Sequence, residues 1–271
     1  MTETTQISAG GAPPRTDGRH DRELRPVRVQ RNFTAAPAGS VLWQQGGTVV
    51  LCTASVTPKV PEWFGPARGG GWVTADYVML PGSTPQRKDW PRIGHTDSRG
   101  TEITRLIGRV LRAAVDLSAL GPHTVSVDCT VLQADGGTRT AAICGGYLAL
   151  RDALAKLPAT LPTPRGEPTP GFLASQAAYN PSASLREPVA AVSVGYVGGV
   201  LRLDLDYSDD AVAEVDLNVA MTASGRVIEV QGTAETPDAH GKVGYTRQQL
   251  QDMLDLAAEG CRRLIDIQTT A

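Results

Sequence analysis

The sequence predicts a mixed fold of the α+β class in which one order of strands and helices is used twice. Short segments of alternating apolar residues, typical of strands, occur in both halves of the 271-residue chain. Glycine-containing turns separate several of these segments in pairs, as in β-hairpins. Longer segments with apolar residues at helical spacing follow the strands in each half, so the two halves share one theme.

The first half combines strands with two helices. The pattern predicts strands at 25–29, 39–43, 48–56, 72–81 and 123–133 and helices at 101–117 and 141–157. Gly46 and Gly47 favour a hairpin turn between two of these strands. Within 101–117, apolar residues from Ile103 to Leu117 share one face, which predicts an amphipathic helix.

The second half has two predicted hairpins and a final helix. Strands at 189–197 and 200–207 flank Gly198-Gly199, and strands at 216–221 and 226–231 flank Ser224-Gly225. A helix at 246–268 opens with Thr246 and Gln249, the spacing of a capping box. The element order therefore suggests a duplicated unit.

Composition divides the chain into four regions. Residues 1–21 are polar and rich in Gly, Pro and Thr, which predicts a disordered tail. Residues 22–157 form the first half and residues 189–271 the second half. Prolines recur through 158–188 without a sustained period, so we predict a long surface loop inserted between the halves.

Charge and cysteine usage limit the class of protein. A net charge of −2 gives no overall attraction to nucleic acid, so any affinity for RNA or phosphate must come from local basic residues. Cys52, Cys129, Cys144 and Cys261 lie apart in apolar patterns, which favours buried free thiols. No apolar run could span a bilayer, and the N-terminus lacks the apolar core of a signal peptide. We therefore expect a cytoplasmic protein without a membrane partner.

A predicted strand, a two-glycine loop and a helix start meet within residues 132–140, Leu-Gln-Ala-Asp-Gly-Gly-Thr-Arg-Thr. Glycines let the backbone approach a ligand closely, and the first N–H groups of a helix attract an anion. Arg139 adds a planar donor fork that suits phosphate. The stretch thus fits an anion site, although Gly136 and Gly137 alone also fit a simple tight turn.

Asp210 and Asp216 form a candidate acidic pair. Six extended residues span roughly 20 Å, so the two carboxylates can share a cation only if the chain turns between them. We expect Asp210 at a strand end and Asp216 at the start of the next strand. Converging carboxylates suit Mg²⁺ and phosphoryl transfer. From spacing alone, acids that merely solubilise a turn are the favoured interpretation.

A basic loop precedes the helix at 101–117. Residues 83–100 carry Arg87, Lys88, Arg92 and Arg99 among Pro, Gly, Asp and His. A solvated surface loop and a loop that faces RNA fit this composition equally well. Arg99 stands just before the helix start, where the helix dipole favours an anion.

With these features in view, the chain resembles the ribonuclease PH family of phosphate-dependent exoribonucleases, from about residue 25 to about residue 268. The matching segments are VLCTAS at 50–55, GWVTADYVMLP at 71–81, RLI at 105–107, RAAVDL at 112–117, LQADGGTRT at 132–140 and EVQGTAE at 229–235. Their number, length and order argue strongly against chance agreement.

The resemblance implies a ribosomal S5 domain 2-like β-β-α-β-α unit, used twice within one compact domain. It implies a homohexamer built as a trimer of dimers. It also implies the reaction: inorganic phosphate shortens RNA by one nucleotide from the 3′ end and releases a nucleoside diphosphate. The family trims the 3′ ends of tRNA precursors, and rRNA is a further candidate substrate.

The resemblance also implies the roles of individual residues. Phosphate-binding residues fall on Arg99, Gly137, Thr138 and Arg139, and the essential acids fall on Asp210 and Asp216. These acids would hold Mg²⁺, or Mn²⁺, and Asp216 could help to protonate the departing 3′ oxygen. Arg87, Lys88 and Arg92 would guide the RNA backbone with little base preference.

The chain also departs from the family pattern. An arginine typically follows Met-Leu-Pro in the family, and here Gly82 takes that position, with Trp90 and Pro91 further along the loop. This departure bears on RNA affinity and tRNA preference rather than on catalysis. Two other interpretations remain: a catalytically silent ring subunit like those of exosomes, and an S5-like RNA-binding protein without activity. The presence of both aspartates and both phosphate arginines argues against a silent subunit.

Overall fold

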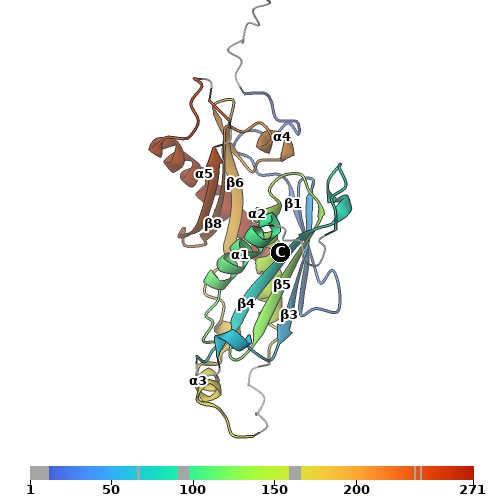
Figure 1. Ribbon diagram of the computed structural model, residues 1–271, viewed down its shortest axis with the longest axis vertical. Coiled ribbons are helices and arrows are strands. Elements are labelled where there is room, and N and C mark those ends of the chain that lie inside the picture. Colours follow the sequence, from blue (N-terminus) through green and yellow to red (C-terminus); the bar gives the residue numbers. More distant parts are fainter. Residues whose placement is uncertain (1–11, 66–67, 91–97, 159–165, 235, 239) are drawn as a thin grey trace, which may run out of the picture.

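The computed structural model describes residues 12–65, 68–90, 98–158, 166–234, 236–238 and 240–271. The described part contains two β-sheets, with helices packed between and beside them (Figure 1). This arrangement confirms the predicted α+β fold class.

The first sheet belongs to the first half of the chain. Its strands are β1 (Val27–Arg31), β2 (Gly39–Gln45), β3 (Thr48–Thr57), β4 (Trp72–Met79) and β5 (Thr124–Gln133), in the order β1-β2-β3-β5-β4. Only the β4–β5 pair is parallel, and helix α1 (Ser98–Ala113) makes the crossover between these two strands. Because β4 and β5 run in parallel, their carboxyl ends open at the same edge of the sheet.

The second sheet is antiparallel throughout. Its strands are β6 (Val189–Val197), β7 (Val200–Leu203), β8 (Val215–Thr222) and β9 (Val227–Ala234), in the order β7-β6-β8-β9. The short helix α4 (Tyr207–Asp210) joins β7 to β8, and the long helix α5 (Arg247–Thr270) ends the chain. The order of strands and helices in the first half thus recurs in the second, except that the helix α4 has only about one turn and β9 is an additional strand.

Helix α2 (Thr138–Leu154) lies at the centre of the molecule and contacts both sheets (Figure 1). Its small residues allow this close packing: a Cβ added at Gly145 would lie 2.8 Å from Cys52 Sγ and 2.9 Å from Trp43 Cβ. Helix α5 packs against the second sheet, where Gly260 approaches Val192, and it also contacts α2, since the Gln268 amide donates to the carbonyl of Cys144 at 3.1 Å. The N-terminus of α2 therefore lies at the junction of the two halves. Asp135, Gly136 and Gly137, which directly precede α2 and are called the glycine loop, lie there too.

The elements predicted from the sequence are present with shifted bounds. The helix predicted at 101–117 begins three residues earlier, at Ser98, and ends four residues earlier, at Ala113. The helix predicted at 141–157 is likewise shifted, to Thr138–Leu154, and the helix predicted at 246–268 extends to Thr270. The three glycine-marked hairpins are confirmed, and Gly46, Gly198 and Gly225 have φ of 57°, 57° and 80°. All four cysteines are buried free thiols, as predicted. In the described part of the chain, no helix has the length and apolar character that a membrane crossing requires.

The prediction of a disordered tail over 1–21 is wrong for residues 12–21, which we call the N-terminal strap. Arg15 is buried, its Nε donates to Asp209 Oδ2 at 2.9 Å, and its Nη2 donates to the carbonyl of Leu203 at 2.6 Å. These buried contacts hold the strap against the second half of the chain. Residues 1–11 lie outside the described residues.

The prediction of an irregular insertion over 158–188 is only partly correct. Helix α3 (Pro170–Ala178) forms within it, because the Thr169 hydroxyl caps the helix by accepting the N–H of Phe172 and Pro170 occupies the first turn. In Figure 1, α3 lies at the opposite end of the molecule from α4. Helix α3 is therefore remote from α4 (Figure 1).

Candidate active site

The glycine loop ends β5 and opens α2. Gly136 and Gly137 have φ of 69° and 61°, a left-handed conformation that suits glycine, and Gly137 is the N-cap residue of α2. Thr48 ties the loop to β3: its hydroxyl accepts from the N–H of Asp135 at 3.0 Å and donates to the carbonyl of Gly136 at 2.6 Å. The loop is therefore a fixed turn at the start of a buried helix, with the geometry that anion sites use.

A buried ion pair lies directly behind this loop. The side chain of Arg25 is 2% exposed and that of Asp204 is fully buried, with Nη2 2.7 Å from Oδ1. Burial alone would raise the pKa of Asp204, but the Arg25 guanidinium and its hydrogen bonds bring that pKa below its usual value. Both partners thus remain charged inside the protein.

The predicted phosphate residues of the first half converge around Tyr77, at the end of β4. The Tyr77 hydroxyl and the Thr138 hydroxyl are 2.8 Å apart. Burial raises the pKa of Tyr77, while the hydrogen bond with Thr138 and the positive charges of Arg99 and Arg139 oppose that rise. Arg99 is exposed in the first turn of α1. Thr138 thus contacts the phenol directly, and the charges of Arg99 and Arg139 both act on it.

Arg139 also contacts the second sheet. Its Nη1 donates to Gln231 Oε1 on β9 at 2.9 Å, and the Gln231 amide in turn donates to Glu102 at 2.9 Å. Gln231 lies opposite Asn218 of β8 in register, so these two side chains share one face of the sheet. Asn218 Nδ2 donates to Asp216 Oδ2 at 3.4 Å. Arg139 and Asp216 therefore face the same side of the molecule.

Asp210 lies on a helix rather than at the predicted strand end. Strand β7 stops at Leu203, and Asp206 then caps the short helix α4, because its carboxylate accepts the N–H of Asp209 at 2.9 Å. Asp210 is the last residue of α4 and Asp216 is the second residue of β8, so the chain does bend between them. The predicted bend between the two aspartates is therefore present, but Asp210 lies at the end of a short helix and not at the end of a strand.

The segment that carries Asp204, Asp206, Asp209 and Asp210, residues 204–210, is called the acidic segment, and it packs directly against the glycine loop. A Cβ added at Gly136 would lie 2.5 Å from the carbonyl carbon of Asp206 and 2.8 Å from the N of Tyr207. The backbone that begins α4 thus rests against the first glycine of the loop. This contact places the segment carrying Asp210 beside the segment that opens α2.

The donor set of the acidic pair fits a hard divalent cation. Carboxylate oxygens are the ligands that Mg²⁺ prefers, and it usually takes one or two of them together with water and phosphate oxygens. Among the described residues, no cluster of three or more His, Cys, Asp or Glu side chains is arranged to hold a metal.

The basic loop, residues 83–100, begins after β4 beside the end of β5, where the glycine loop also starts. The carbonyl of Ser83 accepts the N–H of Ala134 at 2.8 Å, which fixes the loop base next to Asp135. Arg87 and Lys88 are exposed, and Lys88 Nζ lies 3.6 Å from Met79 Sδ. Arg92 lies outside the described residues.

Three residues near the loop escape local sequence reasoning: Arg25, Tyr77 and Gln231. Tyr77 and Gln231 fall within the segments that carry the family resemblance, and this was the available signal for them. Arg25 offers no such signal, because an arginine before a strand reads as a surface charge until its distant partner is known.

Comparison with known proteins covers both halves. The model of the 3′ exoribonuclease family, domain 1, matches residues 23–156, and the model of domain 2 of the same family matches residues 187–260. The two matches together include the glycine loop, both aspartates and the strands that support them.

Similar proteins agree with this assignment. A protein named Ribonuclease PH from Corynebacterium glutamicum (strain R) is 48% identical over 272 residues, covering 100% of this chain and 99% of its own. Ribonuclease PH from Rhodopirellula baltica is 49% identical over 249 residues, covering 92% of this chain and 93% of its own.

Solved structures share the fold. An Archaeoglobus fulgidus exosome with RNA bound to the active site has a chain with a TM-score of 0.72 and 23% identity, covering 93% of this chain and 91% of that one. Rice Rrp46 has a TM-score of 0.69 and 18% identity, covering 94% and 99%. With two family models matched in order and close relatives over nearly the full chain, this chain belongs to the 3′ exoribonuclease family.

Proposed function

We propose that the chain is a phosphorolytic 3′→5′ exoribonuclease, in which inorganic phosphate attacks the last phosphodiester of RNA and a nucleoside diphosphate leaves. The observation that carries the proposal is the junction at Gly136. There, a loop suited to phosphate in the first half packs against the acidic segment of the second half. Family membership and relatives named Ribonuclease PH support the same chemistry.

Phosphate is held by groups from the first half. The free N–H groups at the start of α2, including those of Thr138 and Arg139, attract an anion with the positive end of the helix dipole. The Arg139 guanidinium is oriented by its hydrogen bond to Gln231, and Arg99 adds a second positive charge near Tyr77. Holding the nucleophile in a fixed orientation removes much of the entropic cost of a two-substrate reaction.

Asp210 and Asp216 supply the carboxylates for Mg²⁺, or for Mn²⁺, which accepts the same oxygen donors. When bound, the ion offsets the negative charge that builds on the transferred phosphoryl group. Asn218 orients the Asp216 carboxylate through its amide. Arg139 of α2 contacts the face of the second sheet that carries Gln231, Asn218 and Asp216, so phosphate and the RNA end meet between Arg139 and Asp216.

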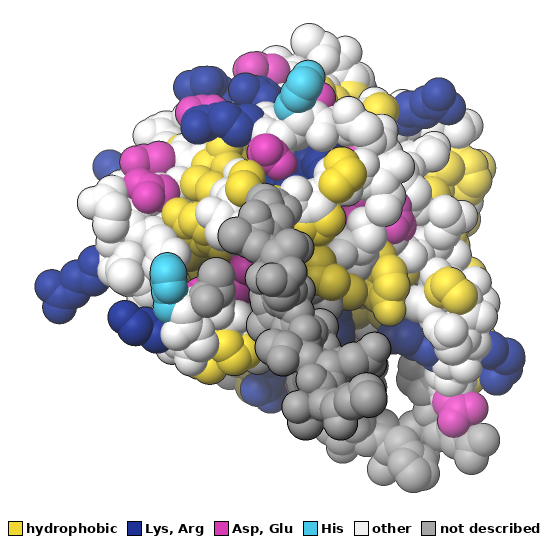
Figure 2. Space-filling view, turned by 90° about the horizontal axis from the view of Figure 1, so that it is seen from above, with side chains coloured by type: hydrophobic (Ala, Val, Ile, Leu, Met, Phe, Trp, Pro, Cys, Tyr) yellow, Lys and Arg dark blue, Asp and Glu magenta, His cyan; other side chains and the backbone are white. Residues whose placement is uncertain are grey.

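RNA reaches this site along local basic residues. The net charge is −2, and on the face shown in Figure 2 the Lys and Arg side chains are interspersed with Asp and Glu side chains. Arg87 and Lys88, exposed beside the glycine loop, therefore guide the RNA backbone, and Arg92 follows them in the same basic sequence.

Further properties follow from family membership. We infer that the substrates are 3′ ends of tRNA precursors and that the protein assembles as a homohexamer, a trimer of dimers. The four buried, unpaired thiols are typical of a reducing compartment, which supports a cytoplasmic location.

The test uses purified protein and a short 3′-labelled RNA with Mg²⁺, with and without orthophosphate. We expect nucleoside diphosphates only when orthophosphate is present, and we expect Asp216→Asn to abolish their release. Asp255→Asn, on the exposed side of α5, is the matched control and should leave the rate unchanged. Equal release by wild type and Asp216→Asn would contradict the assignment, and RNA binding without product would favour a silent subunit.

A further inference from the structure

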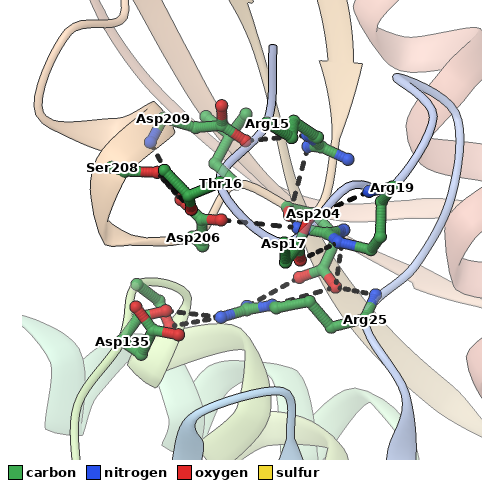
Figure 3. A network of polar contacts seen from close by, with 12 residues as sticks. Arg15, Thr16, Asp17, Arg19, Arg25, Asp135, Asp204, Asp206, Ser208 and Asp209 are labelled. Atoms are coloured by element: carbon green, nitrogen blue, oxygen red, sulfur yellow. Dashed lines mark hydrogen bonds and ion pairs between the residues drawn. The ribbon is translucent and has the colours of Figure 1, made fainter.

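A single guanidinium connects the two halves of the chain behind the glycine loop (Figure 3). Arg25 donates to Asp204 from Nε at 3.1 Å, from Nη2 at 2.7 Å and from its backbone N–H at 2.7 Å. Its Nη1 donates to the carbonyl of Asp135 and, at 3.4 Å, to the carbonyl of Gly136. The acceptor Asp204 belongs to the second half, and the two carbonyls belong to the loop of the first half.

The contacts use the geometry that distinguishes arginine from lysine. A guanidinium offers five N–H donors in a rigid plane, so it can bind a carboxylate on one side and carbonyl groups on the other. A lysine ammonium is a compact charge that can pair with Asp204 but cannot also reach both carbonyls in the same geometry. Arg25 therefore fixes the position of the loop relative to Asp204.

The chain around Asp204 is shaped for this contact. Asp204 has a φ of 56°, an unusual conformation for a residue other than glycine. Immediately afterwards, the backbone of residues 205–207 passes against Gly136, where the closest approach to an added Cβ is 2.5 Å. The ion pair and the glycine contact thus hold the same two segments together at neighbouring points.

The N-terminal strap extends this network to α4. Arg15 and Arg202 both bind Asp209, through Asp209 Oδ2 at 2.9 Å and Oδ1 at 2.6 Å. Arg19 Nη1 lies 3.8 Å from Asp204 Oδ2. Figure 3 shows Arg15 and Arg19 of the strap beside Asp209 and Asp204, and Arg25 between Asp204 and Asp135 of the glycine loop. The position of Asp210, the next residue after Asp209, is therefore coupled to that of the loop.

Stability alone does not account for such a pair. Removing two charges from water is costly, and a buried ion pair often stabilises a fold no better than apolar residues of similar size. A fixed orientation between the phosphate loop and the acidic segment is a function that apolar packing would not supply with the same directionality.

We propose that Arg25, with Asp204 as its counterion, is a positioning residue for the reaction: it sets the distance between the glycine loop and the acidic helix α4. This inference rests on the proposed phosphorolysis. Arg25 touches no reacting atom; it acts through the carbonyls of Asp135 and Gly136.

The test compares Arg25→Lys with Arg31→Lys. Arg31 makes a similar two-point ion pair with Asp152, at 2.9 Å and 2.6 Å, near the far end of α2. For Arg25→Lys we expect the KM for phosphate to rise on the order of tenfold, since a misplacement of about 1 Å can cost up to about 100-fold in rate. The KM for RNA should stay unchanged, and Arg31→Lys should leave both constants unchanged.

A second measurement reports phosphate binding without turnover. Orthophosphate should raise the melting temperature of the wild type and of Arg31→Lys, because a ligand that binds only the native state stabilises it. The rise should be smaller for Arg25→Lys. If Arg25→Lys does not fold, Asp204→Asn serves instead, because asparagine tolerates a positive φ and keeps the shape of the side chain.

The outcomes separate this inference from the proposed function. A wild type that releases no nucleoside diphosphate with phosphate present refutes the phosphorolysis itself. An active wild type, with phosphate KM and phosphate-induced stabilisation unaltered in Arg25→Lys or Asp204→Asn, overturns the positioning role alone. Equal effects of Arg25→Lys and Arg31→Lys also overturn it, because they would report general destabilisation.

Discussion

Replacing Gly136 by alanine tests the contact between the glycine loop and α4 with a single methyl group. The new Cβ would lie 2.5 Å from the carbonyl carbon of Asp206, and also 2.8 Å from the carbonyl oxygen of Leu205. These neighbours are backbone atoms, so no flexible side chain can move aside. The loop and the start of α4 must separate.

The magnitude follows from the geometry. Ordinary van der Waals contact begins near 3.4 Å, so the two segments must part by about 1 Å. A displacement of that size at a reacting centre costs up to about 100-fold in rate. The left-handed conformation at Gly136, with φ of 69°, adds about 1–2 kcal/mol of destabilisation for any alanine.

Gly225→Ala separates these two effects. Gly225 has a φ of 80° in the β8–β9 hairpin, and a Cβ there would meet nothing within 4 Å. Both variants should lose stability, measured as the free energy of unfolding in urea, but only Gly136→Ala should lose phosphate-dependent release of nucleoside diphosphates. If the two variants retain equal activity, the reasoning about the loop contact is refuted.

Three further outcomes are expected. Burial raises the pKa of Asp76, and Asp128 lies opposite Asp76 in register. Asp76→Asn should therefore raise the melting temperature at neutral pH, where the wild-type carboxylate is charged and buried. This gain should vanish at a pH below the usual aspartate pKa, because the carboxyl is then protonated in both the folded and the unfolded protein. The pKa of Asp204 is lowered, because the effect of Arg25 outweighs that of burial, so the stability that this pair contributes is present at neutral pH and lost in acid. In acid unfolding, the stability of Asp204→Asn should therefore depend less on pH than that of the wild type. An arginine at position 82 has open space, since a Cβ added at Gly82 meets nothing within 4 Å. Gly82→Arg should tighten RNA binding and steepen the salt dependence of the RNA affinity by about one released counterion. Fluorescence anisotropy with a labelled RNA at several salt concentrations measures both effects.

Local pattern was sufficient for most elements of the fold. Alternation and helical spacing reflect which face of a segment is buried, and that information is contained in a few consecutive residues. Proline density misled the interpretation of 158–188, because Pro170 begins a helix rather than ending one when a capping residue such as Thr169 precedes it. A short helix such as α4 has too few residues to show a period at all.

The residues of the candidate site also differ in whether local sequence pattern could identify them. The glycine loop and Arg139 could be selected from chemistry, and the roles of Arg99, Asp210 and Asp216 came from the family resemblance. Arg15 and Arg25 could not be identified, because an arginine is buried only when a carboxylate awaits it elsewhere in the fold. The partners here are Asp209 and Asp204, 194 and 179 positions away in the chain. Polar composition near the N-terminus therefore suggested a tail where the fold contains a buried network.

The position of the N-terminal strap has a consequence for synthesis on the ribosome. Arg15 precedes its carboxylate partner Asp209 by 194 residues, so the arginine is translated well before that partner. Until Asp209 has been made, the arginine lacks this counterion. The strap can therefore take its buried position only after the chain as far as α4 has been translated, so this network forms later than the hairpins of the first sheet can.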